Sequence, residues 1–250
     1  MFLVNDILNY LCRLAPIQLK MDFDNCGLLL GRGENKVEKV LLALDVTDDV
    51  VKEAVEIRAD LIISHHPVIF SGLKTLTDNK LLTLVEHNIA VISMHTNLDI
   101  APGGVNDVLI TLLGAKCCDV FDEHGCGRIG VLPEAVDFDA FLHSCKKVLN
   151  CNGLRYYSAG RSVKNLGVMG GSGGDCVDEA FEKGCDTYVT ADIKYHQFQR
   201  AAELGINLID ADHFSTENPI IPVLKARLSD RYPEISFVVS KAHKAIIEFA

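Results

Sequence analysis

The sequence contains no tryptophan and no Cys-x-x-Cys pair, although nine cysteines occur among its 250 residues. The odd cysteine count and the missing pairs argue against a disulfide framework and against a structural zinc site. No apolar run approaches the ~18 residues that a membrane-spanning helix needs. The first residues lack a basic segment followed by a cleavage site, so we expect no signal peptide. These absences predict a reduced, cytoplasmic protein without a membrane partner.

Basic residues are scarce relative to acidic ones: 24 Lys and Arg stand against 34 Asp and Glu, for a formal charge of −10. Proteins bind phosphate backbones through clustered Lys and Arg, so the charge argues against nucleic acid as the main partner. The glycines at 170–174 match neither GxGxxG nor the Walker A pattern. A Gly-rich turn before a helix can hold a phosphate, whereas Asp175 can cap the same N–H groups, and both interpretations stay open.

The sequence does contain a repeated strand–helix–strand pattern, rich in Val, Ile and Leu, that predicts parallel strands with right-handed crossovers. The 48% hydrophobic content excludes a disordered chain. We predict strands at 40–46, 60–64, 89–94, 154–159, 166–169, 186–190, 206–209 and 235–240. Helices are predicted at 4–15, 49–59, up to 87, 107–113, 138–149, 177–183, 193–204 and up to 227 or 228, with 117–128 as a connection.

The strand at 60–64 ends in His65-His66-Pro67, and Pro67 stops the strand. Successive side chains of a strand point to opposite faces. Adjacent histidines therefore do not easily chelate one ion, but each can bind one of two neighbouring ions. Taken alone, the pair is better explained as two ordinary surface histidines, and the other polar residues of the chain are what favour a metal site.

Other polar residues follow neighbouring strands at the same expected edge of the sheet. Asp45, His95 and Asp99 all come after predicted parallel strands, where ligands gather in open α/β sheets. His213 and Glu217 follow a later strand and are four residues apart, so a helix beginning near Ser215 would place them on one side. Capping by Ser215 also explains Glu217 as a first-turn acid.

Five motifs in this order resemble the Nif-three-like, YbgI-type family, catalogued as GTP cyclohydrolase I type 2 homologues. The motifs occupy residues 64–74, 95–107, 170–173, 192–196 and 213–217. The resemblance covers most of the chain and corresponds to the short form of the family. Phe23 stands where the family usually has Trp, Cys26 where it has Val, and Ala191 and Asp212 replace usual glycines.

The resemblance implies an α/β fold of two α/β domains with a dinuclear metal site in the cleft between them, assembled as a toroidal hexamer. We expect one domain to comprise residues 1–127 and 215–250, and the other 128–214. Carried over by motif, the metal ligands are His65, His66, Asp99, His213 and Glu217, with Glu217 bridging two divalent ions.

Imidazole and carboxylate ligands without thiolate suit Zn, Mn, Fe, Co or Ni. Two such ions lower the pKa of a shared water, so we expect a metal-dependent hydrolase whose metal-bound hydroxide attacks a small-molecule, nucleotide-like or phosphorylated substrate. His95, and after it His196, are the candidate acid/base catalysts, although each is equally well explained as an orienting or capping histidine. GTP ring opening is implied by the family's name alone. The alternative is a non-enzymatic metal-binding, trafficking or regulatory protein.

Overall fold

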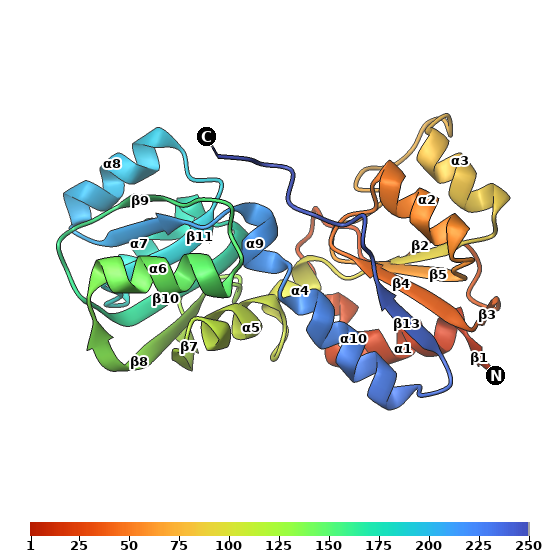
Figure 1. Ribbon diagram of the computed structural model, residues 1–250, viewed down its shortest axis with the longest axis horizontal. Helices are drawn as coiled ribbons and strands as arrows, with labels where there is room; N and C mark the ends of the chain where they lie inside the picture. The colour runs from red at the N-terminus through yellow and green to blue at the C-terminus, as the bar shows by residue number, and fades with distance from the viewer. Residues whose placement is uncertain (250) are drawn as a thin grey trace. The chain divides into compact units, whose positions relative to one another are not determined.

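The structure is a computed structural model that describes residues 1–249, and these residues form two compact units (Figure 1). Unit 1 comprises Met1–Pro102 and Ile221–Lys244, and unit 2 comprises Gly103–Ile220 with the described residues after Lys244. The chain therefore passes from one unit to the other three times. Both units are mixed α/β, which is the fold class that the sequence predicts.

Unit 1 is built on a five-stranded sheet with the order β13-β4-β5-β6-β2. Four strands are parallel, and β2 (Gly27–Leu30) pairs antiparallel with β6. The parallel strands are β13 (Ser236–Val239), β4 (Lys39–Ala43), β5 (Leu61–Ser64) and β6 (Ala90–Ser93). The strand β13, predicted at 235–240, pairs with β4, so the last strand returns to the first sheet. A separate antiparallel pair joins β1 (Phe2–Leu3) to β3 (Lys36–Val37).

Helices cover both faces of the unit 1 sheet (Figure 1). Leu41 and Ile62 point toward α2 (Asp48–Glu56) and α3 (Asn79–Glu86), with which they share one apolar cluster. Helices α1 (Val4–Leu14) and α10 (Ile220–Arg231) cover the opposite face (Figure 1). A 3-10 turn (Ile17–Leu19) and the short helix α4 (Thr96–Ile100) complete the unit. The three central strands β4, β5 and β6 are buried almost throughout, which explains their continuous apolar runs.

Unit 2 has a six-stranded sheet with the order β7-β8-β10-β11-β12-β9. Its central strands β10, β11 and β12 are parallel, and antiparallel strands flank them on both sides. The bounds are β7 (Lys116–Val120), β8 (Arg128–Val136), β9 (Arg155–Tyr157), β10 (Val163–Ser172), β11 (Thr187–Ala191) and β12 (Asn207–Asp210).

One face of this second sheet packs on α5 (Val105–Leu112) and α6 (Phe138–Val148), whose apolar residues share a core with Leu166, Val168 and Val189. The unit also contains α7 (Val177–Glu182), α8 (Tyr195–Leu204), α9 (His213–Glu217) and a 3-10 turn (Gly174–Cys176). Asp137 caps α6 by accepting the N–H groups of Asp139 and Ala140. Gly205, at φ 70°, ends α8.

The structure corrects three sequence-based assignments. The expected connection at 117–128 contains β7 and leads into β8, which pairs antiparallel with β10. The expected Gly-rich loop begins later than predicted, because β10 continues to Ser172. The units also divide differently from the expected domains: residues 103–127 and 215–220 belong to unit 2, since β7 joins its sheet and α5 its core.

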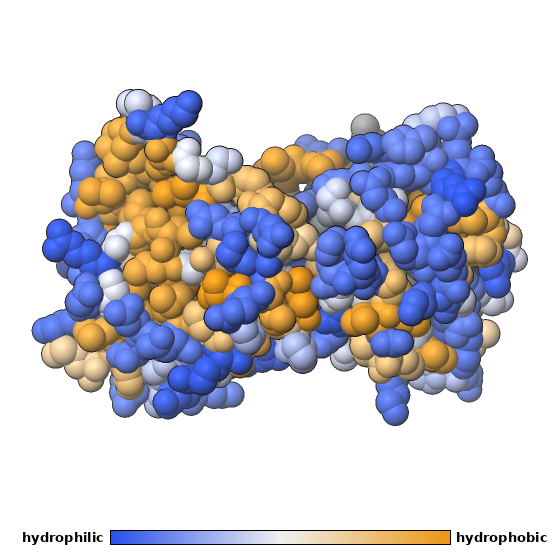
Figure 2. Space-filling model, turned by 180° about the vertical axis from the view of Figure 1, so that it is seen from behind, coloured by the Kyte–Doolittle hydropathy of each residue, from blue (hydrophilic) through white to orange (hydrophobic). Residues whose placement is uncertain are grey.

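All nine cysteines are free thiols, which agrees with the prediction of a protein without disulfides. No helix within residues 1–249 is both long and apolar enough to cross a membrane. On the face drawn in Figure 2, apolar side chains gather over a broad area of unit 1, at the left of the view. In the segment between β5 and α3, the side chains of Phe70, Leu73 and Leu76 are exposed.

Candidate metal centre

Three histidines lie together at the carboxyl edge of the unit 1 sheet. His65 and His66 directly follow β5, and His95 comes two residues after β6. Since β5 and β6 are parallel neighbours, both strands deliver their following residues to the same edge. Each histidine offers a ring nitrogen, and these nitrogens lie within 4.8 Å of one another.

The Nδ1 atoms of His65 and His66 are each held by an oxygen. Nδ1 of His65 lies 2.8 Å from the carbonyl oxygen of Met94. A carbonyl only accepts, so Nδ1 carries the proton there. Nδ1 of His66 lies 2.6 Å from Oδ1 of Asp45, which follows the neighbouring strand β4. A neutral ring protonated at Nδ1 has its lone pair on Nε2, as in most metal-ligating histidines.

His95 is oriented in the same way by Asp24, a carboxylate that is only 5% exposed. Nδ1 of His95 lies 2.8 Å from Oδ1 of Asp24, and the backbone N–H of Thr96 donates to Oδ2 at 3.0 Å. Burial raises the pKa of Asp24, but hydrogen bonds from His95, Thr96 and Cys26 outweigh it and hold that pKa well below its usual range. Asp24 is therefore an ionised acceptor.

The side chains of Asp99 and Cys26 also lie near this histidine cluster, and each carries an atom of a type that can bind a metal ion. Oδ1 of Asp99, on α4, lies 3.5 Å from Nε2 of His65, so a carboxylate oxygen joins the imidazoles. Cys26 donates its thiol hydrogen to Asp24 at 3.1 Å. Burial and that hydrogen bond raise the pKa of Cys26 to about 12, so the thiol stays protonated and acts as a hydrogen-bond donor to Asp24.

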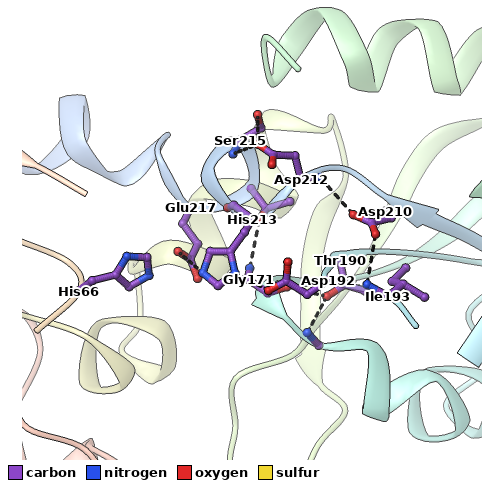
Figure 3. Close-up of polar contacts among 12 residues, drawn as sticks. His66, Gly171, Thr190, Asp192, Ile193, Asp210, Asp212, His213, Ser215 and Glu217 are labelled. Carbon is purple, nitrogen blue, oxygen red and sulfur yellow. Dashed lines mark hydrogen bonds and ion pairs between the residues drawn. The ribbon is translucent and has the colours of Figure 1, made fainter. Parts of the chain in front are cut away.

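Unit 2 carries the second pair of predicted ligands on α9 (Figure 3). Nε2 of His213 and Oε2 of Glu217 are 3.1 Å apart, one helical turn from each other. The helix begins at His213 rather than near Ser215, because Asp212 is its cap and accepts the N–H and the hydroxyl of Ser215. Asp212, at φ 65°, is itself held by a hydrogen bond from its N–H to Asp210 (Figure 3).

Asp192 orients His213 as Asp45 orients His66. Nδ1 of His213 lies 2.7 Å from Oδ2 of Asp192, a residue held at φ 55° just after β11. Burial lowers the pKa of His213, but the carboxylates of Glu217 and Asp192 outweigh burial and raise that pKa to about 9. The negative potential that attracts a proton here attracts a divalent cation equally.

The glycines at the end of β10 make room for Glu217, whose side chain is 4% exposed. Gly171 has φ +66°, and a Cβ on it would lie 2.2 Å from Oε1 of Glu217. The N–H groups of Gly170, Gly171 and Gly173 donate to side-chain oxygens of Asn106, Thr216 and Thr190, respectively. Because protein oxygens occupy these donors, the structure disfavours the phosphate-turn interpretation.

The structure thus brings four predicted residues together in unit 1, namely His65, His66, His95 and Asp99, and two in unit 2, namely His213 and Glu217. His196 is exposed in the first turn of α8. Sequence reasoning missed the roles of Asp24 and Asn106. Their signals in the sequence are weak: Asp24 lies in an acidic loop typical of turns, and Asn106, in the first turn of α5, accepts the N–H of Gly170, a residue distant in the chain, at 2.6 Å.

Comparison with known proteins decides the family. A sequence model described as Duf34/NIF3 (NGG1p interacting factor 3) matches residues 2–245. The chain belongs to the Duf34/NIF3 family. A Clostridium perfringens protein named GTP cyclohydrolase 1 type 2 homolog is 35% identical and aligns over 98% of this chain and 99% of its own length. A Helicobacter pylori GTP cyclohydrolase 1 type 2 is 34% identical over 87% of this chain and 88% of its own length.

Solved structures of this Duf34/NIF3 protein's relatives share its fold. The Staphylococcus aureus hypothetical protein SA1388 has a TM-score of 0.93 at 28% identity, with 100% of this chain and 99% of that chain covered. Reduced HcgD from Methanocaldococcus jannaschii has a TM-score of 0.85 at 28% identity, with 96% and 98% covered. These likenesses, together with the family match, bear out the resemblance recognised in the sequence motifs.

Proposed function

We propose that this Duf34/NIF3 protein is a metal-dependent hydrolase that holds two divalent ions and acts on a nucleotide-like or phosphorylated small molecule. The proposed ligands are His65, His66, Asp99, His213 and Glu217. The proposal assigns the ligands of both units to one dinuclear centre in the cleft between the units, as the family resemblance implies, with Glu217 as the bridge.

One observation carries the proposal: each of four imidazoles has its Nδ1 hydrogen-bonded to an oxygen. The four are His65, His66, His95 and His213, and their acceptors are three carboxylates and one backbone carbonyl. Such acceptors fix the ring orientation and make Nε2 the coordinating nitrogen. Two carboxylates add oxygen atoms as candidate metal ligands: that of Asp99 in unit 1 and that of the buried Glu217 in unit 2.

This donor set fits Zn, Mn, Fe, Co or Ni, because it combines imidazoles and carboxylates without thiolate. Bound divalent ions would supply Lewis acidity and lower the pKa of water. The names of the relatives point to nucleotide substrates, which makes nucleotides the first class to assay.

The chain's own acid/base candidate is His95, and Asp24 is the residue that directs it. The ionised Asp24 carboxylate accepts a hydrogen bond from Nδ1 of His95 and fixes the ring orientation, so that Nε2 is the nitrogen left for proton transfer. Because its nitrogen lies within 4.8 Å of those of His65 and His66, His95 can instead serve as an additional ligand. His196 is the second acid/base candidate.

Metal content by mass spectrometry on protein purified without chelators tests the centre. We expect close to two ions per chain in the wild type, and a loss in both Glu217→Ala and His66→Ala. The matched control is His143→Ala, which removes an exposed histidine on α6. If Glu217→Ala leaves one ion bound and His66→Ala removes only that ion, the two units hold independent sites, and the proposal of one centre is wrong.

Turnover is then screened with nucleotides and phosphoesters in the metal-loaded protein. Hydrolysis that disappears in His66→Ala and persists in His143→Ala supports the enzyme. Stoichiometric metal without any turnover points to the alternative, a metal-binding protein in trafficking or regulation. The toroidal hexamer and the cytoplasmic location stay predictions, and the mass of the native assembly tests the first of them.

A further inference from the structure

Two phenylalanine rings are exposed in unit 1, although aromatic side chains of this size are usually mostly buried. The exposed fraction is 63% for Phe23 and 50% for Phe70. Their ring centroids are 6.3 Å apart, and the ring planes meet at 44°. The pair is therefore tilted rather than stacked, and at least half of each residue stays exposed.

Hydrogen bonds fix the backbone that carries each ring. Phe23 directly precedes Asp24, whose N–H donates to the carbonyl oxygen of Met21 at 3.0 Å. The side-chain amide of Asn25 donates to the carbonyl oxygen of Ile69 at 2.7 Å and so links the loop of Phe23 to the segment of Phe70. Two exposed rings on linked, anchored loops form a preorganised surface.

This surface adjoins the histidine cluster. The ring centroid of Phe70 is 6.4 Å from that of His95, at an interplanar angle of 77°, and His95 is 5.5 Å from His66. The imidazoles are partly exposed, with side-chain exposures of 18% for His95 and 24% for His66. A planar group on Phe70 would thus present its edge to His95.

We propose that Phe23 and Phe70 are a stacking platform for a planar heteroaromatic ring of the substrate. A heteroaromatic ring has apolar faces for the phenylalanines and polar edge atoms for Nε2 of His95, whose Nδ1 is already hydrogen-bonded to Asp24. An aliphatic chain or the apolar face of a second copy would cover the partly exposed His95 ring and offer no polar atom to that nitrogen, which is unfavourable. Ring binding rests on the aromatic pair itself, whereas its use in hydrolysis rests on the proposed function.

A fluorescence titration tests the platform, because the chain has no tryptophan of its own. Phe23→Trp installs a single reporter in the platform. Adenosine and guanosine are the ring-bearing probes, and ribose is the ring-free probe. The matched control is Tyr156→Trp, a reporter of similar exposure on β9 of unit 2 that also corrects for light absorbed by the nucleosides. We expect saturable quenching by the nucleosides in Phe23→Trp alone.

A second substitution in the same background makes the test specific. Phe70→Leu keeps an apolar side chain but removes the ring, and we expect nucleoside affinity about 5- to 150-fold weaker, as for the loss of one base–aromatic stack. Leu76→Ala, an exposed residue of the same segment, is expected to leave affinity unchanged. Metal content is measured in every variant and is expected to equal that of the wild type.

Three results would overturn the platform: no saturable quenching, equal quenching by ribose, or an unchanged affinity in Phe70→Leu. Altered assembly mass in Phe70→Leu without nucleoside binding would instead identify a second copy as the occupant and would also overturn it.

The titration is repeated on metal-stripped protein. Quenching that persists there while the metal-loaded protein shows no turnover keeps the platform and rejects the hydrolase. Turnover in the metal-loaded protein without saturable quenching supports the hydrolase and rejects the platform.

Discussion

Replacing Gly171 by alanine separates the proposed metal-binding role of Glu217 from the stability of unit 2. The new Cβ would lie 2.2 Å from Oε1 of Glu217. Carbon–oxygen contacts are usually ~3.3 Å or longer, so the carboxylate must move by about 1 Å. A long side chain can make that movement at small cost, but metal–ligand distances tolerate only ~0.2 Å. We therefore expect metal affinity to fall by at least ~10–100-fold.

The substitution also places alanine at φ +66°, which costs roughly 1–2 kcal/mol of unfolding free energy. Gly160→Ala is the matched control, since Gly160 lies in the same unit at φ +71° and a Cβ there would meet nothing within 4 Å. Both variants should lose similar stability in denaturant titrations of metal-free protein. Only Gly171→Ala should lose affinity for Zn²⁺ or Mn²⁺ in calorimetric titrations.

Either of two results would refute this reasoning. Wild-type metal affinity in Gly171→Ala would show that the position of Glu217 does not govern binding. An equal loss in both variants would show that backbone strain alone is responsible. A loss of folding cooperativity in Gly171→Ala is checked by the slope of the denaturant transition, which should match the control.

Removing the acceptor of His66 by Asp45→Asn should lower metal affinity ~10–100-fold, because an orienting carboxylate is lost; calorimetry measures it, and wild-type affinity would contradict it. Glu53→Gln should leave metal affinity unchanged but reduce stability in a pH-dependent way. Burial raises the pKa of Glu53, but N–H groups including those of Lys241 and Ala242 outweigh burial and lower it. The stability that Glu53 adds is therefore present above its unfolded pKa of about 4.3 and is lost as the pH falls through the lower folded pKa. The unfolding free energies of wild type and variant should therefore converge at acid pH.

Much of the architecture follows from the sequence, because buried parallel strands need continuous apolar runs. The strands β4, β5 and β6 were predicted for that reason. The antiparallel strands β7 and β8 of unit 2 are among those that escaped prediction. Every residue of β7 is exposed and β8 alternates only in its first half, so neither has an apolar run.

The glycines of β10 show the opposite problem, a local signal with the wrong meaning. Consecutive glycines are typical of loops and phosphate turns. These glycines are instead required by contacts with distant residues. A Cβ on Gly171 would clash with Glu217, and a Cβ on Gly173 would clash with Thr190 and Tyr188. Such close approaches leave no periodic trace in the sequence.

The candidate metal-ligand residues, and their positions just after strands, can be read from the sequence alone. Strand ends and histidines are both local features of the chain. His65, His66 and His95 follow their strands for that reason. Tertiary structure alone decided which oxygens fix those rings. Asp24 reaches His95 because β2 runs antiparallel to β6 and starts where β6 ends, a pairing that depends on residues distant in the chain.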